Sequence, residues 1–403
     1  MKLLLITYHF LQSNEPSSIQ ARRFFTSLAD SGVKITIFTK KVKQKINFFH
    51  KNIEIIEVFG FESRVISAVL RIFLKDLTLI PDLETIFWNP FVVYKIKKKI
   101  DLHQYSLIHT ISYPFSTHLI PIKLNVKNKL PWVAQFYDPW IENSFRDYSI
   151  NAFSDWNLKM EELVANQSDM IIHSNNHIVR SWSIRYGLPI ESKILTLPFC
   201  IDDTNSSVST KINSNNKIIL SHIGSLYGRR NLDIIILVLQ RLKQSHEIHN
   251  LNFCLNLVGF VSKDELNKIK NSGISDLIKI SGKIPYEQSL AFIQNSDILL
   301  LIEDNSDESY FFPSKLTDYL KSNKPILAIT SNKSIVNTIL NKSGQKTYNY
   351  NQIDILHYDL LVLIQKLFRN EKIEYTYDLD EFLPKSVVKK YLDFLRNYSI
   401  CSH

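Results

Sequence analysis

The chain has 403 residues, of which 45% are hydrophobic and 22% charged, an ordinary globular balance in a chain long enough for two domains. The formal net charge is +9, but no recognition module accompanies the basic excess, which argues against a nucleic-acid partner. Three cysteines without metal-ligand spacing favour a reducing compartment, the cytosol, over a disulfide framework.

Three features bear on membranes. The opening MKLLLIT is too short for a signal peptide and suits a buried first strand. The most apolar long stretch, residues 65–80, is broken by three charged residues, so no spanning helix is expected. Residues 95–100 (KIKKKI) follow several aromatic residues, a pattern that suits either an anionic bilayer surface or a solvated helix face.

The first half of the chain alternates apolar runs with helical patterns. A strand at residues 2–7, a helix at 19–31 and a strand at 34–39 form a βαβ unit and predict an α/β fold. The first loop, residues 8–18, follows a parallel strand at the edge where open α/β sheets bind ligands. Further strands are expected at 53–58, 106–110, 170–173 and 194–197, and further helices at 62–100, 116–124 and 178–186.

A polar segment, residues 202–216, is short of large apolar residues and is predicted to be an interdomain linker. The pattern resumes after it, with strands expected at 217–223, 251–258 and 278–281 and helices from 232 and over 286–295. We therefore predict a first domain over residues 1–201 and a second over 217–385, followed by an amphipathic helix at 386–403.

Residues 310–330 (YFFPSKLTDYLKSNKPILAIT) carry the clearest chemistry. They predict a loop, a helix from about 314 to 321, a stop and a strand. Lys315 and Asp318 are three residues apart near the start of that helix, where an anion is favoured. Lys315 suits a phosphate, and Asp318 suits two vicinal hydroxyls such as those of a ribose. A solvated ion pair is the alternative.

Residues 218–330 resemble the C-terminal, donor-binding half of retaining glycosyltransferases of the GT-B fold, in the large family four. The block PSKLTDYLKSNKPILAIT is similar to the segment that closes over the nucleotide, and IILSHIGSLYGRRNLDIIILVLQRL has the matching strand, tight turn, basic residue and helix. The resemblance implies two Rossmann-like domains facing each other across a cleft, with the C-terminal helix packed back on the first domain.

The resemblance also implies a donor site. Arg230, six positions after a glycine, corresponds to a residue that contacts the donor diphosphate, whereas Ser225 replaces an arginine found in relatives. Tyr310 stands where the family has the first of two acids, and Glu303 and Glu308 are possible substitutes. The implied donor-binding residues are Gly224, Ser225, Arg230, Gly282, Ser314, Lys315 and Asp318.

The segment WVAQFYDPW resembles a family strand whose end faces the transferred sugar. Tyr137 and Asp138 stand where relatives carry a histidine, so we assign them as catalytic, with a helix-capping carboxylate as the alternative for Asp138. The first loop lacks the glycines of the family. The implied acceptor-side residues are Ser17, Ser18, Arg22 and His109; a surface position for Arg22 and a packed core position for His109 remain open.

The resemblance implies a transferase that moves a sugar from a nucleotide-diphosphate sugar to a saccharide or lipid-linked acceptor, with retention and without a metal or cofactor. A cytoplasmic protein, peripheral on the inner face of the membrane, is expected. Two other functions remain open, because fold does not determine chemistry: a nucleotide-sugar epimerase or hydrolase, and a non-catalytic nucleotide-sugar-binding subunit.

Overall fold

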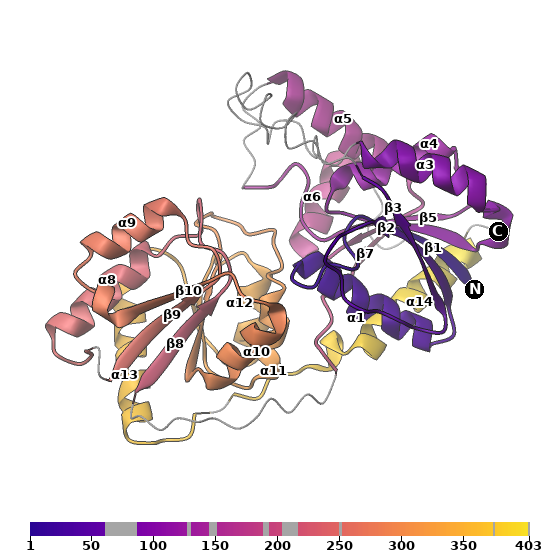
Figure 1. Ribbon diagram of the computed structural model, residues 1–403. Coiled ribbons are helices and arrows are strands. Elements are labelled where there is room, and N and C mark those ends of the chain that lie inside the picture. Colours follow the sequence, from indigo (N-terminus) through magenta and orange to yellow (C-terminus); the bar gives the residue numbers. More distant parts are fainter. Residues whose placement is uncertain are drawn as a thin grey trace. The chain divides into compact units, whose positions relative to one another are not determined.

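The computed structural model describes residues 1–60, 87–126, 130–144, 151–187, 193–203, 217–249, 252–373 and 375–401. The chain forms two compact units (Figure 1). The first comprises Met1–Cys200, Tyr310–Phe312 and Glu381–His403, and the second comprises Ile201–Ser309 and Pro313–Asp380. The chain therefore passes between the units at several points rather than through one linker.

Two sequence predictions lie largely outside the described residues. Residues 204–216 of the predicted linker are among those not described. The same holds for residues 61–86, which contain the apolar stretch of 65–80. The helix predicted over 62–100 is therefore represented only by its last part.

The first unit is built on a parallel sheet of seven described strands in the order β3-β2-β1-β4-β5-β6-β7. The strands are β1 (Lys2–Thr7), β2 (Lys34–Lys40), β3 (Ile53–Val58), β4 (Leu107–Ile111), β5 (Trp132–Phe136), β6 (Met170–His173) and β7 (Ile194–Thr196). The chain begins at β1 and builds outward in both directions, so the strand order reverses between β1 and β4. This reversal is a topological switch point, where ligands bind in such sheets.

Helices cover both faces of this sheet (Figure 1). They are α1 (Pro16–Asp30), α3 (Trp88–Lys99), α4 (Leu119–Leu124), α5 (Asn151–Gln167), α6 (Asn176–Tyr186) and α14 (Pro384–Cys401), with short 3-10 helices η2 (Leu102–Gln104), η3 (Phe115–His118) and η5 (Asp380–Phe382). Strands such as β1 need this cover because Leu3 to Ile6 are all fully buried, on both faces of the pleat.

Helix α1 starts three residues earlier than predicted. Pro16 occupies its first turn, a position that needs no backbone N–H, and the buried Ala21, Phe25 and Leu28 form its core-facing stripe. The C-terminal helix α14 packs against α1 in the first unit, and the Tyr391 ring meets Phe24 edge to face at 5.3 Å.

The second unit repeats the same plan. Its parallel sheet has six described strands in the order β10-β9-β8-β11-β12-β13. The strands are β8 (Ile218–Ile223), β9 (Phe253–Val258), β10 (Ile278–Gly282), β11 (Ile298–Ile302), β12 (Ile326–Ile329) and β13 (Thr347–Tyr348). The order again reverses once, between β8 and β11, which sets the switch point of this unit.

The helices of the second unit also lie on both faces of its sheet (Figure 1). They are α8 (Asp233–Gln244), α9 (Lys263–Asn271), α10 (Tyr286–Asn295), α11 (Lys315–Lys321), α12 (Ile335–Lys342) and α13 (Ile353–Phe368), with the 3-10 helix η4 (Ser275–Leu277). Both sheets are parallel and sandwiched, so the predicted α/β class with two Rossmann-like domains is confirmed.

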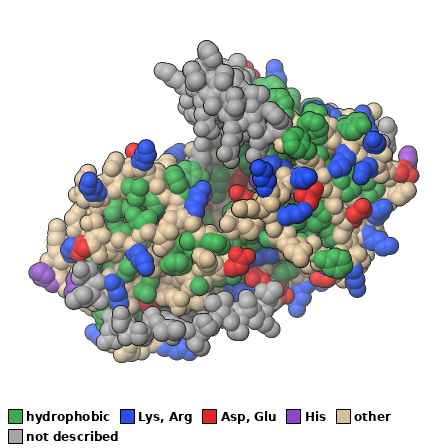
Figure 2. All heavy atoms as spheres, in the orientation of Figure 1, with side chains coloured by type: hydrophobic (Ala, Val, Ile, Leu, Met, Phe, Trp, Pro, Cys, Tyr) green, Lys and Arg blue, Asp and Glu red, His purple; other side chains and the backbone are tan. Residues whose placement is uncertain are grey.

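On the side seen in Figure 2, Lys and Arg side chains of the described residues lie among hydrophobic and other polar side chains. Within the described ranges no helix is both long and apolar enough to cross a bilayer.

Candidate functional site

The switch point of the second unit brings several of the predicted donor residues together. β8 and β11 are neighbours and parallel, so the residues that follow them share one edge of the sheet. Gly224 follows β8 and Glu303 follows β11, while α11 begins with Lys315. This is the edge at which open α/β sheets bind ligands.

The turn after β8 is built for close approach. Gly224 has a φ of 150°, and a Cβ there would lie 2.8 Å from Nζ of Lys315. Gly259 has a φ of 132°, and its Cβ would lie 2.2 Å from the carbonyl oxygen of Gly224, a backbone clash that cannot relax. Both positions therefore require glycine, and the Lys315 amine is held directly against the turn.

His222, which the sequence analysis did not single out, also contacts the Lys315 amine at this turn. Its Nδ1 lies 3.1 Å from the carbonyl oxygen of Leu300, so Nδ1 carries the proton and Nε2 is an acceptor. That Nε2 lies 3.4 Å from Nζ of Lys315. Burial, the Lys315 charge and Arg230 keep the pKa of His222 well below its usual value, so the ring stays neutral and the tautomer is defined.

The charged form of Lys315 is disfavoured at this position. Burial and the neighbouring Arg230 lower the pKa of its amine well below the ordinary lysine value, and the carboxylate of Glu303 only partly opposes them. Two basic side chains thus converge at one glycine turn. An arriving anion with more than one charge would relieve their repulsion, so the arrangement suits a diphosphate.

Glu303 is a buried carboxyl at the end of β11. It accepts a hydrogen bond from the Ser309 hydroxyl at 3.1 Å and another from the Thr330 hydroxyl. Burial raises the pKa of Glu303 to about 7, although these hydrogen bonds oppose the shift. The fold therefore places an acid that titrates near neutrality beside Arg230 and Lys315.

Tyr310, by contrast, belongs to the first unit and packs against its hydrophobic core. Of the two possible substitutes for the missing acid, Glu303 is the one whose charge acts on Lys315.

Asp318 lies on the next turn of α11. Its Oδ1 accepts from the Tyr286 hydroxyl at 3.0 Å, a partner from the start of α10 that was not predicted. The Tyr319 hydroxyl accepts from the backbone N–H of Ile223 at 3.0 Å and thereby ties α11 to the end of β8. Asp318 is thus held at the same edge as Lys315, half-buried and within reach of a polar ligand.

The remaining residues predicted to bind the nucleotide-sugar donor are found in turns and at ends of elements of the second unit. Gly282 ends β10 with a φ of 68°, and its carbonyl accepts from the N–H of Gly259 at 2.7 Å. Ser225 is half-buried in the turn after Gly224, and Ser314 is the N-cap residue of α11. These residues shape the edge through their main chain.

In the first unit, the predicted acceptor-side residues of the first loop support the loop itself. The Ser18 side chain is buried and donates to Oε1 of Gln12 at 3.0 Å. Arg22 donates to the carbonyl oxygens of Phe10 and Gln12, at 2.6 and 2.9 Å. Ser17 is half-buried. Ser18 and Arg22 therefore hold the conformation of the loop, and an acceptor-side role for Ser17, Ser18 and Arg22 stays a prediction.

His109 is a core residue, so its assignment to the acceptor side is corrected. It lies fully buried in β4, with Nε2 2.9 Å from Oε1 of Gln135 and Nδ1 2.9 Å from the Tyr391 hydroxyl. Burial lowers the pKa of His109 to about 3. Its imidazole is a neutral link between the sheet and α14.

Tyr137 is likewise a packing residue. Its ring is buried and meets Phe199 edge to face at 5.2 Å, and its carbonyl accepts from the Ser174 hydroxyl at 3.0 Å. Burial raises the pKa of the phenol above its usual value, which suits no acid or base role. Asp138, half-buried after β5 at the carboxyl edge, remains the candidate from this pair.

His9 is a candidate functional residue of the first unit that the sequence analysis did not identify. It follows β1 in the first loop, at the switch point between β1 and β4. Burial and the charge of Lys40 lower the pKa of His9 to about 4, so its imidazole is neutral at physiological pH. The signal in the sequence was its place just after the first strand rather than any motif.

No group of three or more His, Cys, Asp or Glu side chains among the described residues could hold a metal ion. Metal independence therefore rests on the resemblance and stays a prediction.

Comparisons with known proteins agree on the architecture. No family model matches the chain, and no curated protein is found as a relative. Solved structures do match: sucrose-phosphate synthase from Thermosynechococcus elongatus has a TM-score of 0.64 at 13% identity, over 100% of this chain and 97% of that one. WaaG, a glycosyltransferase involved in lipopolysaccharide biosynthesis, has a TM-score of 0.63 at 13% identity, over 98% and 96% of the two chains.

A variant of TarM from S. aureus, solved with fondaparinux, α-GlcNAc-glycerol and UDP, has a TM-score of 0.64 at 12% identity, over 98% of this chain and 99% of that one. Identities this low establish the fold alone, and the assignment to family four stays a prediction. The predicted resemblance is confirmed at that level: the chain has the GT-B fold of these glycosyltransferases.

Proposed function

We propose that the protein is a glycosyltransferase that moves a sugar from a nucleotide-diphosphate sugar to a saccharide or lipid-linked acceptor in cell-surface polysaccharide biosynthesis. The observation that carries this proposal is the pair of basic residues at the switch point of the second unit, Lys315 held against the Gly224 turn beside Arg230. Such an arrangement suits the diphosphate of a donor.

The roles proposed for single residues rest on the resemblance together with this geometry. Lys315 and Arg230 offset charge that builds up on the diphosphate as the bond between the anomeric carbon and the phosphate oxygen breaks. Asp318, held by Tyr286, accepts hydrogen bonds from the ribose hydroxyls. The main chain at Gly282 lies beside the nucleobase. Asp138, in the other unit, contacts the transferred sugar or the acceptor.

In the transfer, the diphosphate leaves with the bonding electron pair and the acceptor oxygen bonds to the anomeric carbon. The acceptor proton passes to the leaving phosphate oxygen, so the anomeric configuration is retained without a separate base. TarM was solved with UDP and an α-GlcNAc glycoside, and WaaG acts in lipopolysaccharide biosynthesis; both support a nucleotide-sugar donor and a surface saccharide product.

We also propose that the protein works at the cytoplasmic face of a membrane. The supporting surface, here named the basic-aromatic face, consists of Phe59, Phe91, Tyr94 and Lys97–Lys99 on and beside α3. Exposed aromatic rings beside lysines suit the interface of an anionic bilayer, where a lipid-linked acceptor would be presented.

Incubation of the purified protein with a panel of nucleotide sugars, with and without a lipid-linked saccharide, tests the function. We expect release of nucleoside diphosphate only when the acceptor is present. Isomerised or hydrolysed donor without an acceptor would identify an epimerase or hydrolase instead. Binding without turnover would identify a non-catalytic subunit, an alternative favoured by the packing of Tyr310 in the first unit.

A second arm of the same assay tests the metal. Transfer should survive an excess of EDTA, because the basic side chains Lys315 and Arg230 stand where a divalent cation would otherwise offset the diphosphate. Loss of activity with EDTA and its rescue by magnesium or manganese would contradict this arm of the proposal.

A further inference from the structure

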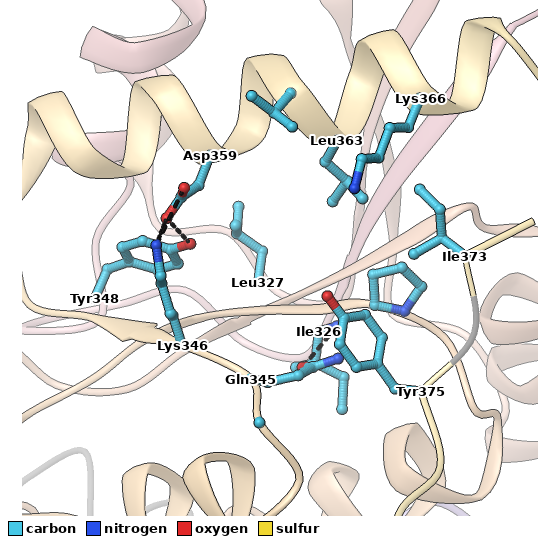
Figure 3. A pocket seen from close by; sticks show the side chains of 13 residues that line it. Ile326, Leu327, Gln345, Lys346, Tyr348, Asp359, Leu363, Lys366, Ile373 and Tyr375 are labelled. Carbon is cyan, nitrogen blue, oxygen red and sulfur yellow. Dashed lines mark hydrogen bonds and ion pairs between the residues drawn. The ribbon is translucent and has the colours of Figure 1, made fainter. Parts of the chain in front are cut away.

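The second unit has a cavity at the opposite edge of its sheet from the candidate donor site. Its lining includes residues just before and at the start of β12 and β13, together with α13 and the segment around Tyr375 (Figure 3). Its volume is about 240 Å³. We call it the α13 cavity. Leu327, Leu363 and Ile373 provide an apolar wall.

The hydrogen-bond acceptors of this cavity are already engaged. Asp359 accepts from Nζ of Lys346 at 3.0 Å and from the Tyr348 hydroxyl at 2.9 Å (Figure 3). The side-chain oxygen of Gln345 accepts from the backbone N–H of Ile326 at 3.2 Å. A ligand would therefore find few acceptors for its own donors.

The hydrogen-bond donors that line the cavity are less fully engaged than its acceptors. Gln345 is only 5% exposed, and within the described part of the chain its buried Nε2 has no hydrogen bond of good geometry, although its side chain interacts with the Tyr377 hydroxyl. The Tyr377 hydroxyl near it donates to the carbonyl of Lys324 at 2.9 Å. A primary amide has two N–H donors and the Tyr377 hydroxyl can accept from only one of them, so the other N–H marks a place where an acceptor fits.

Two further donors line the same space. Lys366 is exposed on the last turn of α13, and Figure 3 shows its side chain reaching toward the space bounded by Tyr375 and Gln345. The Tyr375 hydroxyl also points into this space (Figure 3). Neither group has an ion pair or side-chain hydrogen bond to any residue that the structure describes.

We infer that the α13 cavity binds a small oxyanion, a carboxylate or a phosphate ester, carried on a compact and partly apolar body. Lys366 supplies the positive charge, Gln345 and Tyr375 supply neutral donors, and the apolar wall receives the body. The volume lies below that of typical drug-sized sites, which limits the body to about one ring. This inference does not depend on the proposed glycosyltransferase function, because the residues are different.

Three small probes of matched shape test the inference on the full-length protein: benzoate, phenyl phosphate and neutral benzyl alcohol. Binding is measured by saturation-transfer NMR and by titration at low salt. We expect at least one anion to bind about tenfold or more tightly than benzyl alcohol, and the stronger of the two anions distinguishes a carboxylate from a phosphate ligand. Water filling alone, with no bound anion, would overturn the inference.

Variants then locate the binding. Lys366→Ala should lower the affinity for the anion about tenfold to 150-fold, and Tyr375→Phe should lower it about twofold to tenfold. Lys270→Ala, which removes an exposed lysine from the last turn of α9, is the matched control and should leave the affinity unchanged.

Nucleoside diphosphate binding and the melting temperature should be unchanged in Lys366→Ala, which separates this cavity from the donor site and from a folding defect. Equal affinities in Lys366→Ala and Lys270→Ala would show that the anion binds elsewhere and would overturn the assignment.

Discussion

The folded protein disfavours the charged form of the Lys315 amine. Burial and Arg230 lower the pKa of its amine, so the folded protein holds fewer protons here than the unfolded chain does. A group of this kind reduces stability below its ordinary pKa, and the penalty shrinks as the pH rises toward 10.5. A residue kept at such a cost is a functional candidate.

Lys315→Met should therefore stabilise the ligand-free protein at neutral pH and abolish tight diphosphate binding. Each gain of about 1 kcal/mol would raise the melting temperature by roughly 2–4 °C in a unit of this size. Arg230→Ala should lower the affinity for nucleoside diphosphates about tenfold to 150-fold, which is the effect of losing one charge-assisted contact. Calorimetric titration with UDP, GDP and ADP measures the affinities.

Lys270→Ala serves again as the control and should change neither property. If Lys315→Met and Arg230→Ala both bind nucleoside diphosphates like the wild type, the phosphate assignment is wrong.

Glu303 gives a second residue-scale prediction. Because burial raises its pKa to about 7 from 4.5, the folded protein keeps a proton that the unfolded chain has lost, and stability falls as the pH rises through this window. Glu303→Gln should remove that fall. We expect the variant to match the wild type near pH 5 and to exceed it by about 1–3 kcal/mol at pH 8 in urea unfolding.

Glu287→Gln, an exposed substitution on α10, is the matched control and should follow the wild type at every pH. A difference between Glu303→Gln and the wild type that does not change with pH would mean that this carboxyl does not titrate near neutrality.

At the scale of single elements, α3 shows how packing divides a cluster of like charges. Lys95 is half-buried and donates to the carbonyl oxygen of Glu57 at 2.6 Å, so it serves β3 rather than solvent. Lys97–Lys99 are exposed, and Nζ of Lys98 lies 5.9 Å from the centre of the Tyr94 ring. Tyr94 and Phe59 are 65% and 61% exposed. The basic-aromatic face therefore carries three of the four lysines that the sequence suggested.

Replacing Lys97, Lys98 and Lys99 together with glutamine should weaken binding to anionic vesicles by up to about 1 kcal/mol per lysine and make it less sensitive to salt. Nucleotide binding should not change, since the residues for it lie in the other unit. Co-sedimentation measures the first effect and calorimetry the second.

The matched control removes three exposed lysines of α14, namely Lys385, Lys389 and Lys390, and should bind vesicles like the wild type. Equal losses in both triple variants would indicate a net-charge effect. Wild-type protein that does not co-sediment at low salt would exclude this face as a membrane surface.

At the scale of the whole molecule, the two units differ in their response to acid. Burial keeps the pKa of His109 and of His173 at about 3 and that of His118 well below its usual value, all in the first unit. A histidine whose pKa is lowered by folding takes up a proton when the protein unfolds in acid. The free energy of unfolding therefore decreases as the pH falls below about 6.5. The second unit has His222 in this state.

These histidines should therefore make the first unit lose stability progressively between pH 7 and pH 5, while the raised pKa of the buried Glu161 acts in the opposite direction. All five tryptophans lie in it, so the urea midpoint from tryptophan fluorescence reports on this unit alone. His109→Gln should make the decline shallower, while His103→Gln, at an exposed position, should not alter it. A decline that His109→Gln leaves unchanged would contradict the assigned burial of this ring.

Local pattern sufficed for much of the scaffold. The strands at residues 2–7, 53–58 and 170–173 were predicted to the residue, because short apolar runs bounded by polar residues are read from neighbours alone. Strand β11 and helices α9, α12 and α13 were not predicted. The five apolar residues of β11 do not alternate and fit a buried helix equally well, so only its pairing with β8 and β12 decides.

The sequence by itself determined the parallel α/β class and the resemblance to GT-B proteins, since these follow from periodicity and from residues close together in the chain. It also singled out Lys315, Arg230 and Asp318, whose roles stay predictions. Only the tertiary structure decided burial and partners. It placed His109 and Tyr137 in the core, joined Lys315 to His222 and Glu303, and assigned Tyr310 to the first unit. The physical reason is that pKa values and hydrogen-bond partners depend on groups far apart in sequence, which no local pattern specifies.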